Sequence, residues 1–141
     1  MIYEELKRAW EENKSKINGP ATESEIEDFE KRHQIILPAS FKDYLRVVNG
    51  MQQYEADAEL ISFFSLAEMS ENLPRSSFNP LGEMRFADFC MGSHGYVFDL
   101  TNGQEHVLAS DYGGNHKLLA TSFSSFISMY LQDLDSIAFC W

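Results

Sequence analysis

The sequence predicts an α+β domain with helices at its beginning and end and short antiparallel strands between them. Apolar residues recur at helical spacing as far as residue 48, short apolar runs separated by turn-forming residues occupy 60–109, and a helical stripe returns at 122–133. Helices grouped apart from antiparallel strands are typical of a layer in which the helices lie to one side of a sheet. With a length of 141 residues, residues 1–141 are expected to form one domain.

The first predicted helix covers 2–17. Ile2, Leu6, Trp10 and Ile17 follow one another at intervals of four and seven residues, as on one face of an amphipathic helix. Gly19-Pro20 would end this helix, because proline cannot continue the helical hydrogen bonding.

The second predicted helix begins at a capping box and runs to about His33. Thr22 and Glu25 have the required spacing, at which each side chain satisfies a backbone N–H that the first helical turn leaves unpaired. Ile26 and Phe29 lie on the face that this helix would present to the core.

The third predicted helix opens at Pro38, whose missing N–H is not needed in a first turn. Its buried stripe contains Phe41, Tyr44, Leu45 and Val48. Asn49-Gly50 then offers a left-handed C-terminal cap.

After Gly50 the sequence predicts four short strands, at 60–64, 84–90, 96–100 and 106–109. Asn102-Gly103 suits a tight hairpin, so the last two strands are expected to pair antiparallel. A short helix is expected at 65–72, a loop at 73–82, and a closing helix at 122–133 with Phe123, Phe126, Ile127, Tyr130 and Leu131 on one face.

The formal charge of −11 is the strongest signal in the composition. Residues 1–48 hold 10 acidic and 8 basic side chains, whereas 49–141 hold 12 acidic and 3 basic, so the later segment carries −9 of the total. A field of this sign repels nucleic acid and anionic lipid and attracts cationic surfaces, so neither DNA, RNA nor a membrane is expected as a partner. The alternative is that the acidity serves solubility alone.

Targeting and redox signals point to the cytoplasm. The two cysteines, Cys90 and Cys140, are too few for a disulfide framework, and no signal-peptide pattern or membrane-spanning apolar run is present. Both thiols are expected to be buried or idle, because free cysteine usually behaves as a small hydrophobic residue.

Three segments in order carry a resemblance to a known family: T-E-S-E-I-E-D-F-E-K-R (22–32), I-L-P-A-S-F-K-D-Y-L-R-V-V-N-G (36–50) and T-S-F-S-S-F-I-S-M-Y-L (121–131). Together they resemble the pattern of the SUKH superfamily. The resemblance implies a strongly bent antiparallel sheet with helices packed around it. In bacteria it implies an immunity protein that neutralises a polymorphic or contact-dependent toxin, frequently a nuclease. A fungal branch regulates cell-wall synthesis through protein contacts, but its long extra segments have no counterpart in this sequence.

Segments 51–82 and 90–95 follow no family pattern, and partner identity is expected there because exposed loops carry recognition on a fixed fold. The predicted contact face combines carboxylates with tyrosines that could anchor a cationic partner: Tyr54, Glu55, Asp57, Glu59, Asp88, Tyr96, Asp99, Asp111 and Tyr112. For the acidic residues the alternative is solvated surface, and for the tyrosines it is core packing.

Seven potential metal ligands fall within 88–116: Asp88, Cys90, His94, Asp99, His106, Asp111 and His116. None of their spacings matches a metal-site signature, so no metal and no cofactor is expected.

Catalysis by a nucleophile is also disfavoured by the sequence. Cys90 and His94 come nearest to a nucleophile and its base, but they lack a strand-to-helix nucleophile elbow, and a structural pair is the better interpretation.

The sequence therefore predicts a non-enzymatic immunity protein whose acidic, aromatic-containing face blocks a cognate toxin, occupying the surface that a nuclease offers to phosphates. The alternatives are an intracellular regulatory or scaffold module of the same fold and an unrecognised small hydrolase.

Overall fold

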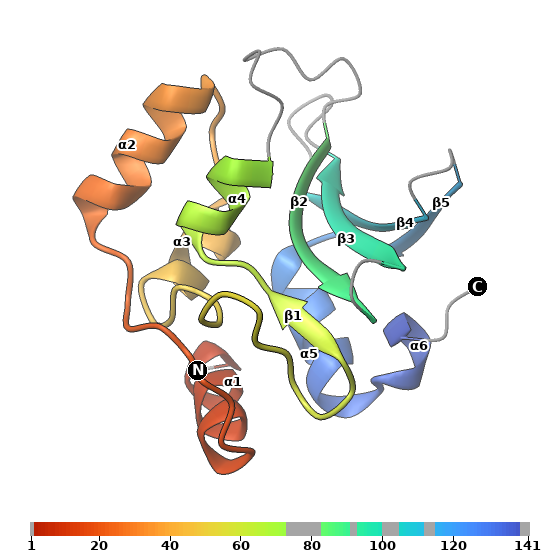
Figure 1. Cartoon of the computed structure of the whole chain (residues 1–141). Coiled ribbons are helices and arrows are strands. Elements are labelled where there is room, and N and C mark those ends of the chain that lie inside the picture. The colour runs from red at the N-terminus through yellow and green to blue at the C-terminus, as the bar shows by residue number, and fades with distance from the viewer. Residues whose placement is uncertain (1, 73–82, 91–92, 100–104, 112–114, 139–141) are drawn as a thin grey trace.

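A computed structural model describes residues 2–72, 83–90, 93–99, 105–111 and 115–138 (Figure 1). The helices and strands are α1 (Ile2–Glu12), α2 (Glu23–His33), α3 (Ala39–Leu45), β1 (Ile61–Phe63), α4 (Leu66–Asn72), β2 (Glu83–Phe89), β3 (His94–Asp99), β4 (His106–Ser110), β5 (His116–Ala120), α5 (Phe123–Gln132) and α6 (Asp135–Ala138). Apart from β5 and α6, they follow in the predicted order. The predicted α+β class is confirmed.

The strands form one sheet with the order β1-β2-β3-β4-β5, and every neighbouring pair is antiparallel. The expected pairing of β3 with β4 is confirmed, while the Asn102-Gly103 turn itself lies outside the described residues. Helix α5 packs on β4 and β5 and also contacts α1 and α3, so it joins the first helices to the sheet (Figure 1).

The sheet is strongly bent. Its pairing register shifts between Arg85 and Ala87 and between Val107 and Leu108, and such irregularities bend a strand and increase its twist. The contact between the Glu83 carboxylate and His116 Nε2, at 2.5 Å, shows the result, because it joins the first residues of β2 and β5 although β3 and β4 lie between these strands.

Aromatic side chains hold the helices to the sheet. Phe86 of β2 lies 4.6 Å from Phe98 of β3, centroid to centroid, and Phe41 of α3 lies 5.0 Å from both Phe98 and Phe123 of α5. All four rings are fully buried. Since each such pair adds about 0.5–1.5 kcal/mol to the free energy of area burial, this cluster fixes the position of the two helices.

Helix α1 ends at Glu12, so the prediction of a helix over 2–17 is wrong for its last five residues, 13–17. Lys14 takes a left-handed backbone conformation with φ of 59°, and Ile17 forms an antiparallel bridge with Met51. The spacing of Ile17 fits a helical stripe, but this long-range bridge decides its conformation.

The predicted capping box is present at the start of α2. The Glu25 backbone N–H donates to Thr22 Oγ1 at 3.1 Å, and the Thr22 N–H donates to Glu25 Oε1 at 3.0 Å. Helix α2 ends at His33 as expected, and Ile26 and Phe29 are buried.

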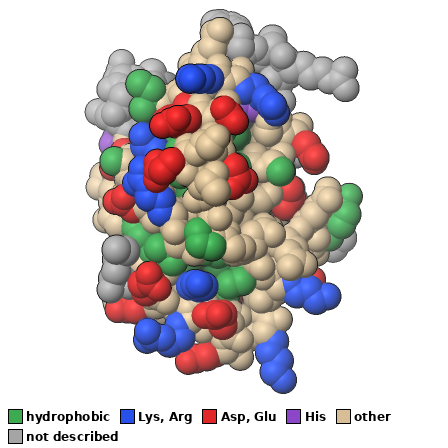
Figure 2. Space-filling model, turned by 90° about the vertical axis from the view of Figure 1, so that its left-hand side faces the viewer, with side chains coloured by type: hydrophobic (Ala, Val, Ile, Leu, Met, Phe, Trp, Pro, Cys, Tyr) green, Lys and Arg blue, Asp and Glu red, His purple; other side chains and the backbone are tan. Residues whose placement is uncertain are grey.

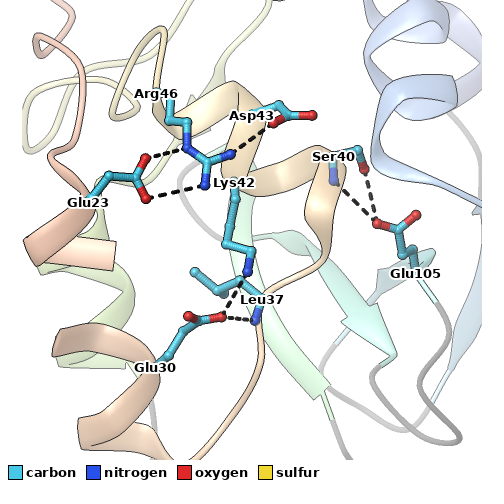
Figure 3. Close-up of polar contacts among 8 residues, drawn as sticks. All are labelled: Glu23, Glu30, Leu37, Ser40, Lys42, Asp43, Arg46 and Glu105. Atoms are coloured by element: carbon cyan, nitrogen blue, oxygen red, sulfur yellow. Dashed lines mark hydrogen bonds and ion pairs between the residues drawn. The ribbon is translucent and has the colours of Figure 1, made fainter. Parts of the chain in front are cut away.

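Polar contacts set the angle between α2 and α3 (Figure 3). The Glu30 carboxylate accepts the Leu37 backbone N–H at 2.8 Å and pairs with Lys42 Nζ at 3.5 Å, while Arg46 donates to the carboxylate of Glu23. The charged side chains of these contacts are half-buried or exposed, so their ion pairs add little to the stability of the fold.

Asn49-Gly50 does not cap α3 as predicted, because that helix already ends at Leu45. Gly50 does have the expected positive φ of 64°, and its missing Cβ would lie 2.4 Å from the backbone oxygen of Phe64. Asn49 Oδ1 accepts the N–H of Leu66, the first residue of α4, at 2.9 Å. The two residues therefore join the end of the helical region to β1 and α4.

Two elements, β5 and α6, were not predicted. In β5 the residues 116–118 are exposed, so the segment H-K-L-L-A lacks the alternation that indicates a strand, and only its pairing with β4 makes it one. Helix α6 has four residues, too few for a periodic pattern.

Candidate functional site

A hollow of about 410 Å³ lies among the loop before β1, the strands β1 and β2 and helix α4, which are neighbours in Figure 1. Glu55, Glu68 and Asp88 supply carboxylates to its wall, and Arg85 supplies a cation. Tyr54 also lines it and is 92% exposed, so its ring stands open to a partner. The hollow thus combines acidic groups with an accessible aromatic ring.

Three residues beside the hollow hold the left-handed backbone conformation that L-residues avoid. Tyr54 and Leu60 both have φ of 67°, and Cys90 has φ of 53°. The Cys90 N–H donates to the Leu60 carbonyl at 2.9 Å, which ties the end of β2 to the loop. Each such residue is disfavoured by about 1–2 kcal/mol and persists only where its surroundings fix it, which is common at functional sites.

Asp57 is the group that fixes this loop. Its Oδ1 accepts the backbone N–H groups of Glu59 at 2.8 Å and Ile61 at 2.9 Å, and its Oδ2 accepts the Tyr130 hydroxyl. Trp10 Nε1 donates to the same Tyr130 oxygen at 2.9 Å. Because Asp57 is only 8% exposed, its predicted place on the contact face is a misassignment: its carboxylate holds the loop from inside.

The electrostatics of the hollow are unfavourable to its own carboxylates. Burial raises the pKa of Glu68, and the negative charges of Asp88 and Glu71 raise it further. Burial also raises the pKa of Asp88, against the opposing effect of the Arg85 guanidinium. Glu68 Oε1 is buried and has no hydrogen-bond partner among the described residues. A cation entering the hollow would favour the charged forms of both carboxyl groups.

Tyr96, another predicted contact residue, is fully buried. Its ring packs on Phe126 with centroids 5.3 Å apart, and its hydroxyl donates to the Ile137 carbonyl at 2.9 Å. For this tyrosine the alternative, packing in the core, is therefore correct, because no partner can reach the side chain in this conformation.

The remaining predicted residues do not form one site. Glu59 is exposed on the loop that carries Tyr54. Asp99 of β3 lies opposite Glu83 of β2 in the strand register, at the other end of these two strands from Asp88. The Asp111 carboxylate accepts the backbone and side-chain N–H groups of Asn115. Tyr112 lies outside the described residues.

Glu68, Arg85 and Leu60 belong to the hollow but were not among the predicted site residues. Glu68 is an acidic residue between the buried Leu66 and Met69 of α4, which is a weak signal in the sequence. Its closeness to Asp88 arises only when α4 packs on β2.

The helical side of the molecule has a different charge pattern. Figure 2 shows Lys and Arg side chains interspersed with Asp and Glu on the face that carries the first helices, in keeping with the 10 acidic and 8 basic residues of 1–48. A surface of mixed sign offers little net attraction to a cationic partner, so the acidic hollow is the better candidate for one.

Other chemistry finds less support in the described residues. His94 is buried, its Nε2 lies 3.3 Å from the Tyr96 hydroxyl, and burial lowers its pKa. Cys90 is exposed, so of the two expectations for this thiol, buried or idle, burial does not hold. Within the described ranges, no three His, Cys, Asp or Glu side chains are grouped to hold a metal ion. Among the same residues, no helix has the length and apolar character needed to cross a bilayer.

Comparison with models of known protein families identifies a match. The model of the SMI1 / KNR4 family (SUKH-1) matches residues 20–129, which include every described element of the hollow. No curated protein matches the chain.

Proposed function

Because the chain belongs to the SMI1 / KNR4 family (SUKH-1), we propose that it is an immunity protein that binds and neutralises a cognate bacterial toxin. The observation that carries the proposal is the acidic hollow with the exposed ring of Tyr54 at its opening. The chain would act in the cytoplasm by recognition, without catalysis, as part of a polymorphic or contact-dependent toxin system.

The chemistry of the hollow suits a cationic protein surface. Exposed tyrosine is a frequent binding hot spot, since a rigid ring supplies contact area with little loss of entropy. Carboxylates around it, here Glu55, Glu59 and Asp88, would attract a positive partner and accelerate association. A toxin nuclease is such a partner, because it must present Lys and Arg to the phosphates of its substrate.

Co-expression with the product of the gene immediately upstream tests the proposal. We expect the upstream product to stop growth when expressed alone, and this chain to restore growth and to co-purify with it. Tyr54→Ala together with Glu55→Lys should weaken the complex and its salt dependence, because both residues line the hollow.

Glu27→Lys is the matched control, since it makes the same charge change at an exposed position of α2. Asp57 is left unchanged because it holds the loop. If the upstream product is toxic but neither bound nor neutralised, or is harmless by itself, the immunity proposal fails and a regulatory or scaffold role of the same fold takes its place.

A further inference from the structure

We propose that the hollow receives one arginine side chain of the partner, with its guanidinium against the Tyr54 ring and its N–H groups directed to the carboxylates of Glu68 and Asp88. This inference rests on the proposed function, because it names the group of the partner that the same hollow binds. It concerns recognition chemistry and leaves the identity of the partner open.

The size of the hollow fits one long side chain. Its volume of about 410 Å³ exceeds the roughly 30 Å³ that a water molecule occupies in the liquid by more than tenfold, so an arginine side chain and several waters can enter together. The opening lies beside Tyr54 and Leu60, which are 92% and 52% exposed, so a side chain can approach without displacing the core.

The charge of the wall favours a cation. Glu55, Glu68 and Asp88 contribute −3 and Arg85 contributes +1 when all are ionised, which leaves −2 on the wall. The neighbouring Glu71 adds to the negative potential at Glu68. The Arg85 guanidinium favours the charged form of Asp88, whereas the charged form of Glu68 is favoured by a backbone hydrogen bond from Ser65 and opposed by the charges of Asp88 and Glu71.

One acceptor in the hollow lacks a donor. Glu68 Oε1 is buried and unpaired among the described residues, and buried polar atoms in folded proteins nearly always have a partner. The Glu68 side chain as a whole is half-buried, so a turn of this side chain toward the opening would let an N–H group of a binding partner supply the missing donor. The charge of Glu68 then favours a cationic donor over a neutral amide or hydroxyl, because a hydrogen bond between charged groups is about twice as strong as a neutral one.

Arginine suits the site better than lysine for two reasons. Its planar guanidinium can donate to two carboxylates at once, whereas an ammonium acts as a point charge. Its flat face can also stack on an aromatic ring, and the ring of Tyr54 is accessible for this contact.

The test uses small blocked amino acids and the whole chain without any toxin. N-acetyl-arginine methylamide is titrated into the ¹⁵N-labelled protein at pH 7 and constant ionic strength, while the amide signals of Tyr54, Glu68 and Asp88 are followed by NMR. Blocked citrulline, which has nearly the same shape and no charge, and blocked lysine are titrated in parallel. We expect saturable shifts with arginine and an affinity at least about fivefold above that of citrulline and of lysine.

Glu68→Gln should reduce the arginine affinity at least about threefold, whereas the matched Glu71→Gln, on the same helix but outside the wall, should reduce it less than Glu68→Gln does. Equal binding of citrulline, equal binding of lysine, or equal effects of the two variants would overturn the assignment. Because no toxin is present, a negative result here leaves the co-expression test of the immunity function unaffected, and the reverse also holds.

Discussion

Tyr130→Phe removes one hydroxyl that joins three parts of the molecule. This oxygen accepts from Trp10 Nε1 in α1 at 2.9 Å and donates to Asp57 Oδ2 in the loop, while the rest of Tyr130 belongs to α5. Phenylalanine keeps the ring, whose centroid lies 5.1 Å from that of Phe63. The substitution therefore tests the hydrogen bonds with little change in packing.

The expected loss of stability follows from the two bonds. A hydrogen bond to a charged group contributes about 1.5–3 kcal/mol, and a buried donor left unpaired costs about 1–3 kcal/mol. Both contacts are partly buried, so water can replace part of each, and we expect a decrease of about 2–4 kcal/mol in the free energy of unfolding. This is a large share of the roughly 5–15 kcal/mol typical of a domain.

Urea unfolding followed by circular dichroism measures the effect. Tyr54→Phe is the control, because it makes the same chemical change on a side chain that is 92% exposed, and it should alter stability by less than about 0.5 kcal/mol. In Tyr130→Phe the amides of Glu59 and Ile61 should also exchange faster with solvent, since both donate to Asp57. A loss below about 1 kcal/mol, or an equal loss in the control, would refute the role assigned to the hydroxyl.

Three further predictions concern single residues. Gly50→Ala should destabilise the fold by more than about 2 kcal/mol, because φ at Gly50 is positive and the new Cβ would meet the Phe64 backbone. Gly19→Ala is the control in the same urea assay: its Cβ would meet nothing within 4 Å, so it should have little effect. Glu68→Gln should be more stable than the wild type at pH 7, because the pKa of Glu68 is raised in the folded state and the wild type therefore loses stability as the pH rises. The difference in the free energy of unfolding between the two proteins should shrink as the pH falls toward 4.5, and a difference that grows toward low pH would contradict this. The wild type should lose stability as the pH falls below 6.5, because the lowered pKa of His94 favours the neutral form in the folded state, and His94→Gln should lose less. Thermal melts from pH 7 to 5 measure this, and an equal fall of the melting temperature with pH in the two proteins would contradict it.

The candidate site was partly predictable. Tyr54, Glu55 and Asp88 were selected from the sequence as acidic or aromatic residues near strand ends, and the structure brings these three together at one hollow. Asp57 and Tyr96 have the same local character, yet both side chains are buried and hydrogen-bonded. Local composition does not distinguish an exposed carboxylate from one that satisfies loop amides, because the difference lies in which segment packs over it.

Sequence pattern alone predicted the order of the helices and strands other than β5 and α6, the capping box at Thr22 and the buried stripes of α2 and α3, because these depend on residues a few positions apart. It also determined the excess of negative charge after residue 48. Only the tertiary structure decided where α1 ends, that 116–120 is a strand, and that Glu68 meets Asp88. Each of these depends on contacts between distant segments, whose free energy exceeds the weak local preference of the residues involved.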